Sequence, residues 1–496
     1  GEKNEIVQIA DLASNNRLFS NRILANATTQ TGIGGLPFDE NRIDRNTLVG
    51  GSKGIHFEGT DFMGFSNDST HMTRLIGNTL YQQTDTAIYL KKNLCPVVQG
   101  NSIYASDSSI VGIFLEENNQ TTILANRIRL LNGGTGIYLD PYYGYDHNLM
   151  ANNEVLVNTE QPDAAIELVT TGSTDKFDVV HNTLFLKGDN PSTYCIKAND
   201  DHSSIRIQNN ILVNEAYGNT LNQNFNSNYN CFFTNGQYIA FIVSELNEWQ
   251  DPYGHTLSIS HSPVFQSDSV LSPLNPRIDG KGLPLSEVTT DINGNTRDGA
   301  HPDMGAYEYT GYSSPMSGVY SIGLSGADFE SFNEAVDSLI VHGIEDSVVM
   351  EVQPGTYEEQ VSIPQIEGTL PTQTVAFQSQ THDSTDVQLS FGARNETHNY
   401  TLGLGGADHF IFEHMGIHST DSTYNNGVVL KDSSQYNLFR NNMIAGYPIK
   451  SADANHSLFY IPGKDNLHTT ILNNRFLNGG YSINKDGSGT DTLVVD

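Results

Sequence analysis

The sequence has few cysteines that could form disulfides and few basic residues that could bind polyanions. Of 496 residues only three are cysteine (Cys95, Cys195 and Cys231), an odd number set in hydrophobic runs, which excludes a disulfide framework. Lys and Arg number 25 against 57 Asp and Glu, a formal net charge of −32. Nucleic acids and anionic membrane surfaces require basic patches, so both are excluded as partners. No hydrophobic run is long enough for a membrane-spanning helix, which excludes membrane insertion.

What the sequence does have is a phrase that returns at regular intervals. A hydrophobic residue, one or two small or polar residues, an Asn and a hydrophobic pair recur at spacings of 25, 32, 23, 25, 27, 29 and 28 residues. Such a period is typical of a solenoid, in which stacked neighbours bury the apolar face that one repeat cannot bury alone. The recurring residues are Asn21, Asn46, Asn78, Asn101, Asn126, Asn153, Asn182 and Asn210.

A second phrase runs in step with the first: a small residue, then Ile, a variable residue and another hydrophobic one. Its alternation predicts short strands whose Ile side chains share one inward column, namely Ile55, Ile88, Ile113, Ile137 and Ile166. Helical spacing is nearly absent over residues 1–240. The sequence therefore predicts an all-β fold, a right-handed parallel β-helix.

The recurring Asn residues fit the same geometry. Coils of a β-helix stack about 4.8 Å apart, so an Asn at the same bend of each coil can bond the Asn above and below. Asn also tolerates the left-handed backbone of a tight turn. We interpret the column as a structural ladder; the alternative is a row of amide ligands.

The variable position of the second phrase points outward and is aromatic or imidazole in four successive copies: His56, Tyr89, Phe114 and Tyr138. Exposed aromatic rows mark interaction sites and suit the flat faces of sugars, so these four residues are candidate ligand-binding residues. In the alternative interpretation, the rings only stabilise neighbouring coils or lie beneath a loop.

Residues from about 240 to 310 break the repeat and carry three phrases of their own. They resemble the closing segment of secreted right-handed parallel β-helix proteins of the pectate-lyase-like superfamily, which implies a cap on a first domain spanning 1–310 and identifies a fold more than an activity. The residues that carry the resemblance are Trp249, Gln250, Pro276, Ile278, Asp279, Asp291, Gly294, Asn295, Arg297, Asp303, Gly305, Ala306, Tyr307 and Glu308.

The same segment contains oxygen-bearing side chains that invite a Ca²⁺ site. Their spacing does not match an EF-hand, whose twelfth position would be Pro302. We favour a capping network in which Arg297 pairs with a nearby carboxylate, and otherwise expect no cofactor. The weak metal candidates are Asp291, Asn293, Asn295, Asp298 and Asp303.

A second domain is predicted from 319 to 496, after a small, polar linker at 311–318. Apolar residues at helical spacing predict a helix over about 328–342 with Gly343 as its stop. With the phrase at 352–364 it resembles the opening of pectin-methylesterase-like β-helices, where a helix plugs the first coil. The first domain opens in mid-coil and the second stops on an apolar strand, so we expect a segment of a longer polypeptide whose further β-helix domains are its partners.

No catalytic residue carries over from either resemblance, because the catalytic phrases of both families are missing. Asp146 and His147 lie side by side, yet such a pair is usually a solvated turn. The leading hypothesis is a non-catalytic structural or adhesive module of a large secreted protein at the cell surface, similar to long β-helical proteins that bacteria export for adhesion or gliding. Surface polysaccharide or other cell-surface proteins would be its partners.

The alternative hypothesis is a polysaccharide lyase-like enzyme that acts on an anionic polysaccharide. Such an enzyme needs a base and a cation at the sugar, and hence a basic cleft. The side chains that could form one by clustering in space are Arg127, Arg129, Lys176 and Lys197.

Overall fold

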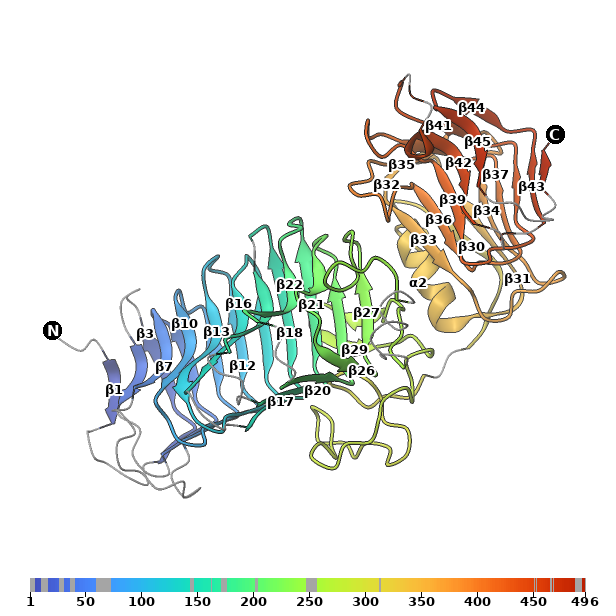
Figure 1. The fold of residues 1–496 in the computed structure, drawn as a ribbon. Helices are drawn as coiled ribbons and strands as arrows, with labels where there is room; N and C mark the ends of the chain where they lie inside the picture. The colour runs from blue at the N-terminus through green and yellow to red at the C-terminus, as the bar shows by residue number, and fades with distance from the viewer. Residues whose placement is uncertain are drawn as a thin grey trace. The chain divides into compact units, whose positions relative to one another are not determined.

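The computed structural model places the chain in two compact units, Gly1–Thr310 and Gly311–Asp496, each of which is described by itself (Figure 1). No helix within the described part of the chain is long and apolar enough to cross a membrane. The described residues are 5–9, 17–25, 31–35, 41–58, 73–142, 147–161, 163–170, 176–200, 204–246, 257–311, 314–449, 451, 453–463, 466, 468–486 and 493–495.

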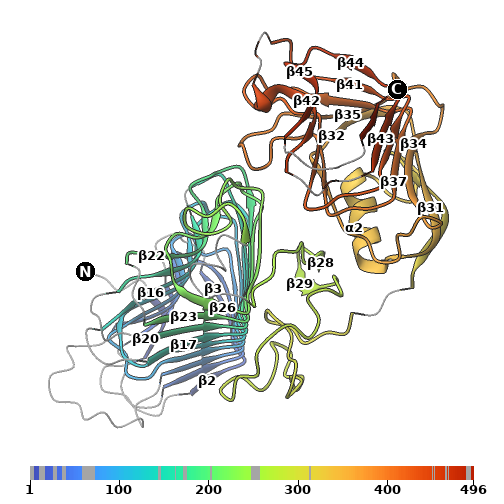
Figure 2. The same ribbon diagram turned by 45° about the vertical axis from the view of Figure 1, so that its right-hand side comes forward.

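Unit 1 is built from three parallel sheets of nine strands, which the chain visits in turn during each coil (Figure 2). Sheet A contains β1 (Glu5–Ile9), β4 (Thr31–Gly35), β7 (Lys53–Glu58), β10 (Thr86–Lys91), β13 (Val111–Asn118), β16 (Thr135–Pro141), β19 (Ala164–Leu168), β22 (Tyr194–Ala198) and β25 (Asn219–Leu221). Sheet B contains β2 (Arg17–Phe19), β5 (Arg42–Asp44), β8 (Arg74–Ile76), β11 (Val97–Gln99), β14 (Thr122–Leu124), β17 (His147–Ala151), β20 (Lys176–Val180), β23 (Ile205–Gln208) and β26 (Asn226–Asn228). Sheet C contains β3 (Arg22–Ala25), β6 (Thr47–Gly50), β9 (Thr79–Tyr81), β12 (Ser102–Ala105), β15 (Arg127–Leu130), β18 (Glu154–Thr159), β21 (Thr183–Gly188), β24 (Ile211–Asn214) and β27 (Cys231–Thr234).

The coils of unit 1 lie in register, so equivalent side chains form columns along the stack. Ile55 pairs with Ile88, Ile88 with Ile113, and the column continues through Ile137 and Ile166. All five side chains are completely buried. Alternation within each strand sends these residues inward and the variable position outward. The predicted right-handed parallel β-helix is thus confirmed.

The residue before each inward Ile is small for a steric reason. A Cβ added at Gly54 would lie 2.6 Å from the carbonyl oxygen of Ala87 in the next coil. The same addition at Gly136 would lie 2.5 Å from the carbonyl oxygen of Ala165. Backbones of adjacent coils approach closely here, which the small residue permits.

The recurring Asn residues form a continuous hydrogen-bonded ladder at the corner between sheets B and C. The Nδ2 of each residue donates to the Oδ1 of its counterpart in the next coil at 2.9–3.1 Å, and so does its backbone N–H at 2.8–3.0 Å. The ladder runs from Asn21 through the predicted residues to a ninth, Asn230. All but the exposed Asn21 are buried. Burial in a low-dielectric core makes each bond costly to lose.

One expectation about the ladder is wrong. The left-handed backbone belongs to the residue before each Asn, with φ between 53° and 65°, and not to the Asn itself. The Asn follows the tight bend, so its side-chain amide can point along the stack. The left-handed residues are Ser20, Arg45, Gly77, Gly100, Ala125, Asn152, His181, Asn209 and Tyr229.

The middle of the ladder should be much more sensitive to mutation than its end. Asn126→Ala removes the Oδ1 that accepts from the backbone N–H and Nδ2 of Asn101, and the Nδ2 that donates to the Val98 carbonyl. We expect the free energy of unfolding of unit 1 to fall by about 2–4 kcal/mol, measured by urea denaturation. Asn21→Ala, at the exposed end, should cost less than about 1 kcal/mol. Equal losses at both positions would contradict this account.

Residues after the last coil fold back over unit 1. They include the antiparallel hairpin of β28 (Phe265–Ser267) and β29 (Val270–Pro273). Leu271, Ile278 and Met304 are completely buried in one cluster with Leu156 and Phe185 of sheet C. The outward side of sheet C is covered there. Trp249 and Gln250 lie outside the described residues.

Unit 2 repeats the architecture with other strand lengths. Sheet D contains β30 (Met316–Ile322), β31 (Ile344–Val352), β34 (Val375–Ser379), β37 (Phe410–Glu413), β40 (Leu438–Arg440), β43 (Thr469–Leu472) and β46 (Leu493–Val495). Sheet E contains β32 (Gly355–Glu358), β35 (Val387–Phe391), β38 (Gly416–Ser419), β41 (Met443–Ala445) and β44 (Arg475–Leu477). Sheet F contains β33 (Val361–Pro364), β36 (Leu402–Gly405), β39 (Val428–Lys431), β42 (Ser457–Ile461), preceded by the short helix η1 (Ala454–His456), and β45 (Tyr481–Lys485).

Helix α2 (Phe332–His342) packs on the first coil of unit 2. Its start lies later than the expected 328, because the Ser331 side chain accepts a hydrogen bond from the Glu334 N–H and so caps the helix. The N–H of Gly343 bonds the Leu339 carbonyl at the other end. Phe332 faces inward and stacks on Phe377, with ring centroids 5.9 Å apart.

Candidate functional site

The outward side of sheet A carries the four ring side chains singled out in the sequence. In the strand register, Tyr89 lies beside His56 on one side and Phe114 on the other, and Phe114 lies beside Tyr138. Each of the four is partly buried. The structure thus brings them together as one row, here called the ring row, along β7, β10, β13 and β16.

The rings of this row turn their faces to one another. Tyr89 and Phe114 stack with centroids 5.2 Å apart and planes 15° apart, and Phe114 and Tyr138 with 4.5 Å and 11°. His56 meets Tyr89 edge to face at 4.7 Å. Lys53 Nζ lies over the Tyr89 ring, 4.2 Å from its centroid. A sugar stacks on a ring face, and here the faces already have partners, so the geometry favours the interpretation that the row stabilises neighbouring coils.

Charged side chains beside the ring row are also paired between coils. Lys91 Nζ lies 2.7 Å from Glu116 Oε1 and 3.6 Å from Glu117 Oε1. The Tyr89 hydroxyl donates to Glu116 Oε2 at 2.9 Å. Further along the sheet, Lys197 donates to Glu167 at 2.8 Å. These charged side chains therefore form ion pairs and hydrogen bonds between successive coils.

These contacts move the pKa values away from those of a general base. The hydrogen bond to Glu116 raises the pKa of Lys91. Burial and the same carboxylate raise the pKa of Tyr89 well above its ordinary range. Burial alone would raise the pKa of Glu116, but the hydrogen bonds from Lys91 and Tyr89 outweigh it and lower that pKa. A proton-abstracting Lys or Tyr needs a lowered pKa instead.

The four cationic side chains that could have formed a basic cleft do not converge. Arg127 and Arg129 lie on sheet C, Lys176 on sheet B and Lys197 on sheet A. Arg127 donates to Asn293 at 2.6 Å. Arg129 is buried against Glu154 and donates to the Asp268 carbonyl at 3.0 Å. These contacts tie the closing segment to the coils.

A charged cluster on sheet B was missed in the sequence. His147 contacts Asp178 in the next coil, and Asp178 also accepts from Arg206 Nε at 2.7 Å. Arg206 reaches on to Glu287 of the closing segment. Asp178 is 31 positions from His147 and 28 from Arg206 along the chain, and only the strand register brings these three together. Asp146, the sequence neighbour of His147, lies outside the described residues.

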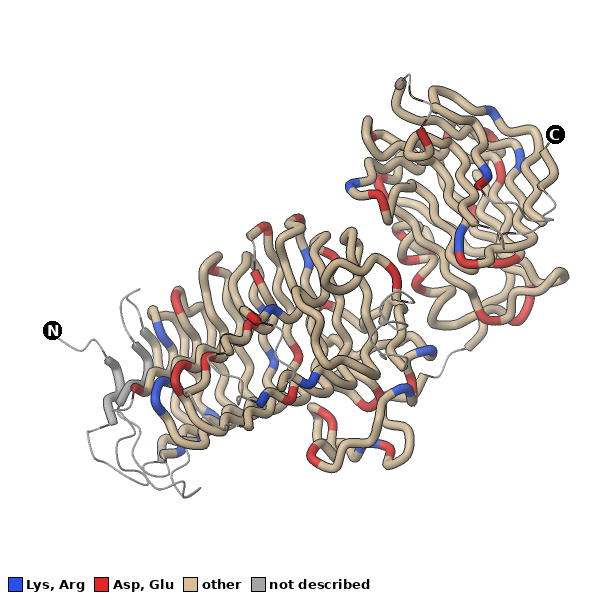
Figure 3. The backbone as a smooth tube through the Cα atoms, in the orientation of Figure 1, with Lys and Arg blue, Asp and Glu red and all other residues tan. Residues whose placement is uncertain are grey.

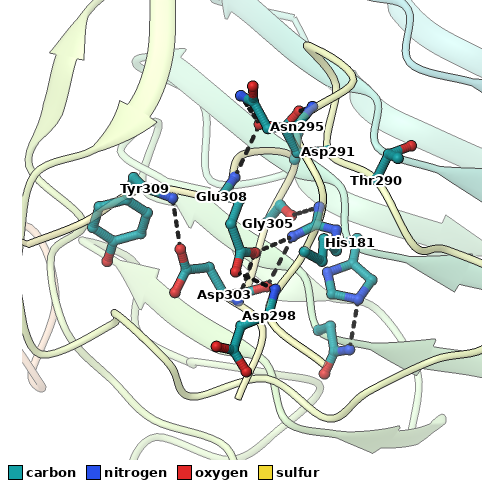
Figure 4. Close-up of polar contacts among 12 residues, drawn as sticks. His181, Thr290, Asp291, Asn295, Asp298, Asp303, Gly305, Glu308 and Tyr309 are labelled. Atoms are coloured by element: carbon teal, nitrogen blue, oxygen red, sulfur yellow. Dashed lines mark hydrogen bonds and ion pairs between the residues drawn. The ribbon is translucent and has the colours of Figure 1, made fainter. Parts of the chain in front are cut away.

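Of the five candidate Ca²⁺ ligands, Asp291, Asn295, Asp298 and Asp303 are hydrogen-bonded within the closing segment (Figure 4), and the Asn293 side chain accepts from Arg127 of sheet C. Asp291 Oδ1 accepts from the backbone N–H groups of Asn293 and Asn295 at 2.8 Å, and Asn295 Nδ2 donates to Asp291 Oδ2 at 3.0 Å. Asp298 accepts from the N–H groups of Ala300 and His301 at 2.7 and 2.8 Å. Within the described ranges, no three or more His, Cys, Asp or Glu side chains are grouped to hold a metal ion.

Arg297 is the centre of this capping network. Its guanidinium lies 3.2 Å from Glu308 Oε2 and donates to the carbonyl of Gly305 at 2.8 Å and to Asn152 Oδ1 at 2.7 Å. Asn152 belongs to the left-handed column of the coil stack. Arg297 is 6% exposed, so its charge is held by these partners and not by water.

Two titratable groups under the cap have opposite pH dependence. Burial, with the Glu308 and Asp279 carboxylates adding to it, raises the pKa of Asp303 to about 7, against hydrogen bonds from Gly280 and Tyr309. Burial first, and then the charge of Arg297, lowers the pKa of the completely buried His181 well below its ordinary value. The folded state therefore favours a protonated Asp303 and a neutral His181.

Comparison with known proteins adds one family match. Residues 39–167, less than half of the chain, match the model of the NosD family, described as periplasmic copper-binding protein. The chain is a parallel β-helix repeat protein. No curated protein matches it. A solved structure of the PL6 family alginate lyase AlyGC is 10% identical, over 95% of this chain and 77% of that chain, with a TM-score of 0.21, too low to carry an argument.

The described residues of the matched range do not fit a copper ion. Copper prefers imidazole and sulfur ligands. Of the described candidates, His56 lies on sheet A and His147 on sheet B, both outward, whereas Met150 is completely buried. Cys95 contacts Gln120 at 3.6 Å. These side chains lie at separate places on the coils, so they do not form one copper site.

The ring row should contribute to the stability of unit 1. Phe114→Ala removes the ring that stacks on both Tyr89 and Tyr138. It should lower the free energy of unfolding by about 2–3 kcal/mol in urea denaturation. Leu131→Ala, half exposed at 50% on the same unit, should change it by about 0.5 kcal/mol or less. If Phe114→Ala matched that control, the rings would not stabilise the stack.

His181 should make unit 1 sensitive to acid. Its folded-state pKa is lowered, so unfolding takes up a proton below about pH 6.5 and stability falls with falling pH, by up to about 1.4 kcal/mol per unit. His181→Asn is the matched variant, because Asn152 and Asn209 occupy the same left-handed position in the adjacent coils. Asp303 is present in both proteins, so its opposite contribution, lost as the pH rises through about 7, cancels in the comparison.

Measured by urea denaturation from pH 8 to 5, the stability of the wild type should fall relative to His181→Asn only below about pH 6.5. Parallel pH profiles of the two proteins would show that His181 is not held neutral.

Proposed function

We propose that the chain is a non-catalytic structural or adhesive module of an exported protein, working outside the cytoplasm and at the cell surface. The observation that carries this proposal is that the outward side chains of sheet A bond one another from coil to coil. Ring faces, lysines and carboxylates are all used in this way. These contacts order the outer side of sheet A along the stack, as a load-bearing or surface-binding module requires.

The charge supports the same proposal. A formal charge of −32 is spread along both units, as Figure 3 shows, so the protein presents an acidic surface. Such a surface repels nucleic acid and other polyanions at long range and favours solubility. The description of the NosD family as periplasmic agrees with export of the chain.

The alternative, a lyase acting on an anionic polysaccharide, has weaker support. Lyase chemistry requires a base that is unprotonated at the working pH. Lys91 is paired with two carboxylates and has a raised pKa, and Tyr89 has a raised pKa as well. Sugar binding to His56, Tyr89, Phe114 and Tyr138 stays a proposal within the adhesive function, since these side chains are only partly buried.

The proposal predicts no catalysis and measurable adhesion. Alginate, pectin and chondroitin incubated with the chain should release no ultraviolet-absorbing unsaturated product. Beads coated with the chain should be retained under flow on surfaces bearing whole bacterial envelopes. Formation of unsaturated product would overturn the non-catalytic function, and retention no better than that of albumin-coated beads would overturn the adhesive one.

The triple variant Tyr89→Ser, Phe114→Ser and Tyr138→Ser separates the two possible roles of the ring row. If the rings only join coils, the variant should melt at a lower temperature and, below that temperature, bind beads to surfaces as well as the wild type. Loss of retention with an intact fold would assign the rings to the binding surface instead.

A further inference from the structure

A second outward column runs the full length of unit 1, on sheet C. Strand register places its nine members side by side, one from each coil. All but one are apolar or aromatic, which is unusual for the outer side of a sheet. The members are Leu24, Val49, Tyr81, Tyr104, Arg129, Leu156, Phe185, Val213 and Phe233.

The chain itself covers the second half of this column. Leu156, Phe185 and Val213 are 3%, 5% and 1% exposed, because they pack in one cluster with Leu271, Ile278 and Met304 of the closing segment. The Phe185 and Phe265 rings lie 5.2 Å apart. Apolar side chains of the closing segment cover this half, and some of them, such as Phe265 and Leu271, come from strands of the hairpin.

The covering stops at Arg129. The guanidinium of this residue donates to the carbonyls of Asp268 and Ser269, at the turn of the hairpin, and pairs with the buried Glu154. Beyond it the same column is open: Leu24, Tyr81 and Tyr104 are 49%, 39% and 37% exposed. Tyr81 and Tyr104 stack with centroids 5.2 Å apart and planes 16° apart. A monomeric protein seldom leaves such a strip without a function.

On sheets B and C, the described residues of the open half carry more positive than negative charge, in contrast to the chain's net charge of −32. On sheets B and C and the corner between them, the described residues of the first four coils include Arg22, Arg42, Arg45 and Arg74. In that described region, Asp44 is the sole carboxylate, and it is buried against Arg42. In a chain of net charge −32, this grouping disfavours pairing with a second copy through the same surface, since like charges would meet, and favours an acidic partner.

We propose that the open strip formed by Leu24, Val49, Tyr81 and Tyr104 is a docking surface for an extended acidic polypeptide segment of a partner protein, with aliphatic side chains alternating with carboxylates. The apolar side chains of that segment continue the packing that Leu271 and Phe265 begin on the same column. Its carboxylates face Arg22 and Arg45. The proposal does not depend on the adhesive function.

A labelled model peptide tests the proposal on the whole chain. The strip crosses four strands about 4.8 Å apart, so a fluorescein-labelled peptide of about six alternating Asp and Leu residues can span it. We expect saturable binding by fluorescence anisotropy, weakening with added salt. Replacing the Asp residues of the peptide by Lys should weaken binding at least about tenfold.

Variants locate the binding. Tyr81→Ser with Tyr104→Ser should weaken binding of the Asp-Leu peptide by about tenfold or more, and Arg22→Gln with Arg45→Gln should reduce both affinity and salt dependence. The matched control is Tyr436→Ser with Tyr447→Ser, two tyrosines 50% and 46% exposed on unit 2, which should leave binding unchanged. Melting curves should show that each variant remains folded at the temperature of the binding assay.

Several results would overturn the proposal. They are absence of saturable binding, equal binding of the Lys peptide, and full binding by the folded Tyr81→Ser/Tyr104→Ser variant. Displacement of the peptide by alginate at concentrations where neutral dextran has no effect would assign the strip to anionic polysaccharide instead.

Discussion

The register of successive coils is the constraint on which the rest of unit 1 depends. Each ladder Asn before the last gives both its backbone N–H and its side-chain amide to the Oδ1 of the Asn in the next coil, in a column that is buried beyond Asn21. A slip of one residue would turn the inward Ile column to solvent and leave these amides unpaired at once. The register in turn places the ring row, the ion pairs of sheet A and the strip on sheet C.

A stack held this way uses its surface side chains as links between coils. The ring row shows the consequence for function most clearly. From the sequence, its four rings are a candidate binding surface for sugars. Because each coil contributes one ring, however, adjacent rings can stack on each other whether or not a sugar is present. A partner is more readily bound where a column lacks its own cover, as on the first half of sheet C.

Much of this could be predicted from the sequence, because the signals are local and repeated. The Asn phrase, the small-Ile phrase and the helix before Gly343 follow from strand alternation and helical spacing. What could not be predicted depends on lateral contacts between coils. The pairing of His147 with Asp178, the reach of Arg206 to Glu287 and the arginine grouping at the B–C corner require the register and the path of the closing segment. Asn230 was missed because its interval of 20 residues is shorter than the others, although its NYNCFF phrase fits the pattern.

Hydrogen–deuterium exchange followed by mass spectrometry on overlapping peptides tests the in-register stack most directly. The peptides that contain Asn78, Asn101, Asn126, Asn153 and Asn182 should be the slowest-exchanging class of unit 1, since these backbone amides donate to buried side-chain oxygens of the next coil. Exchange of these amides as fast as that of the exposed turns would contradict the account.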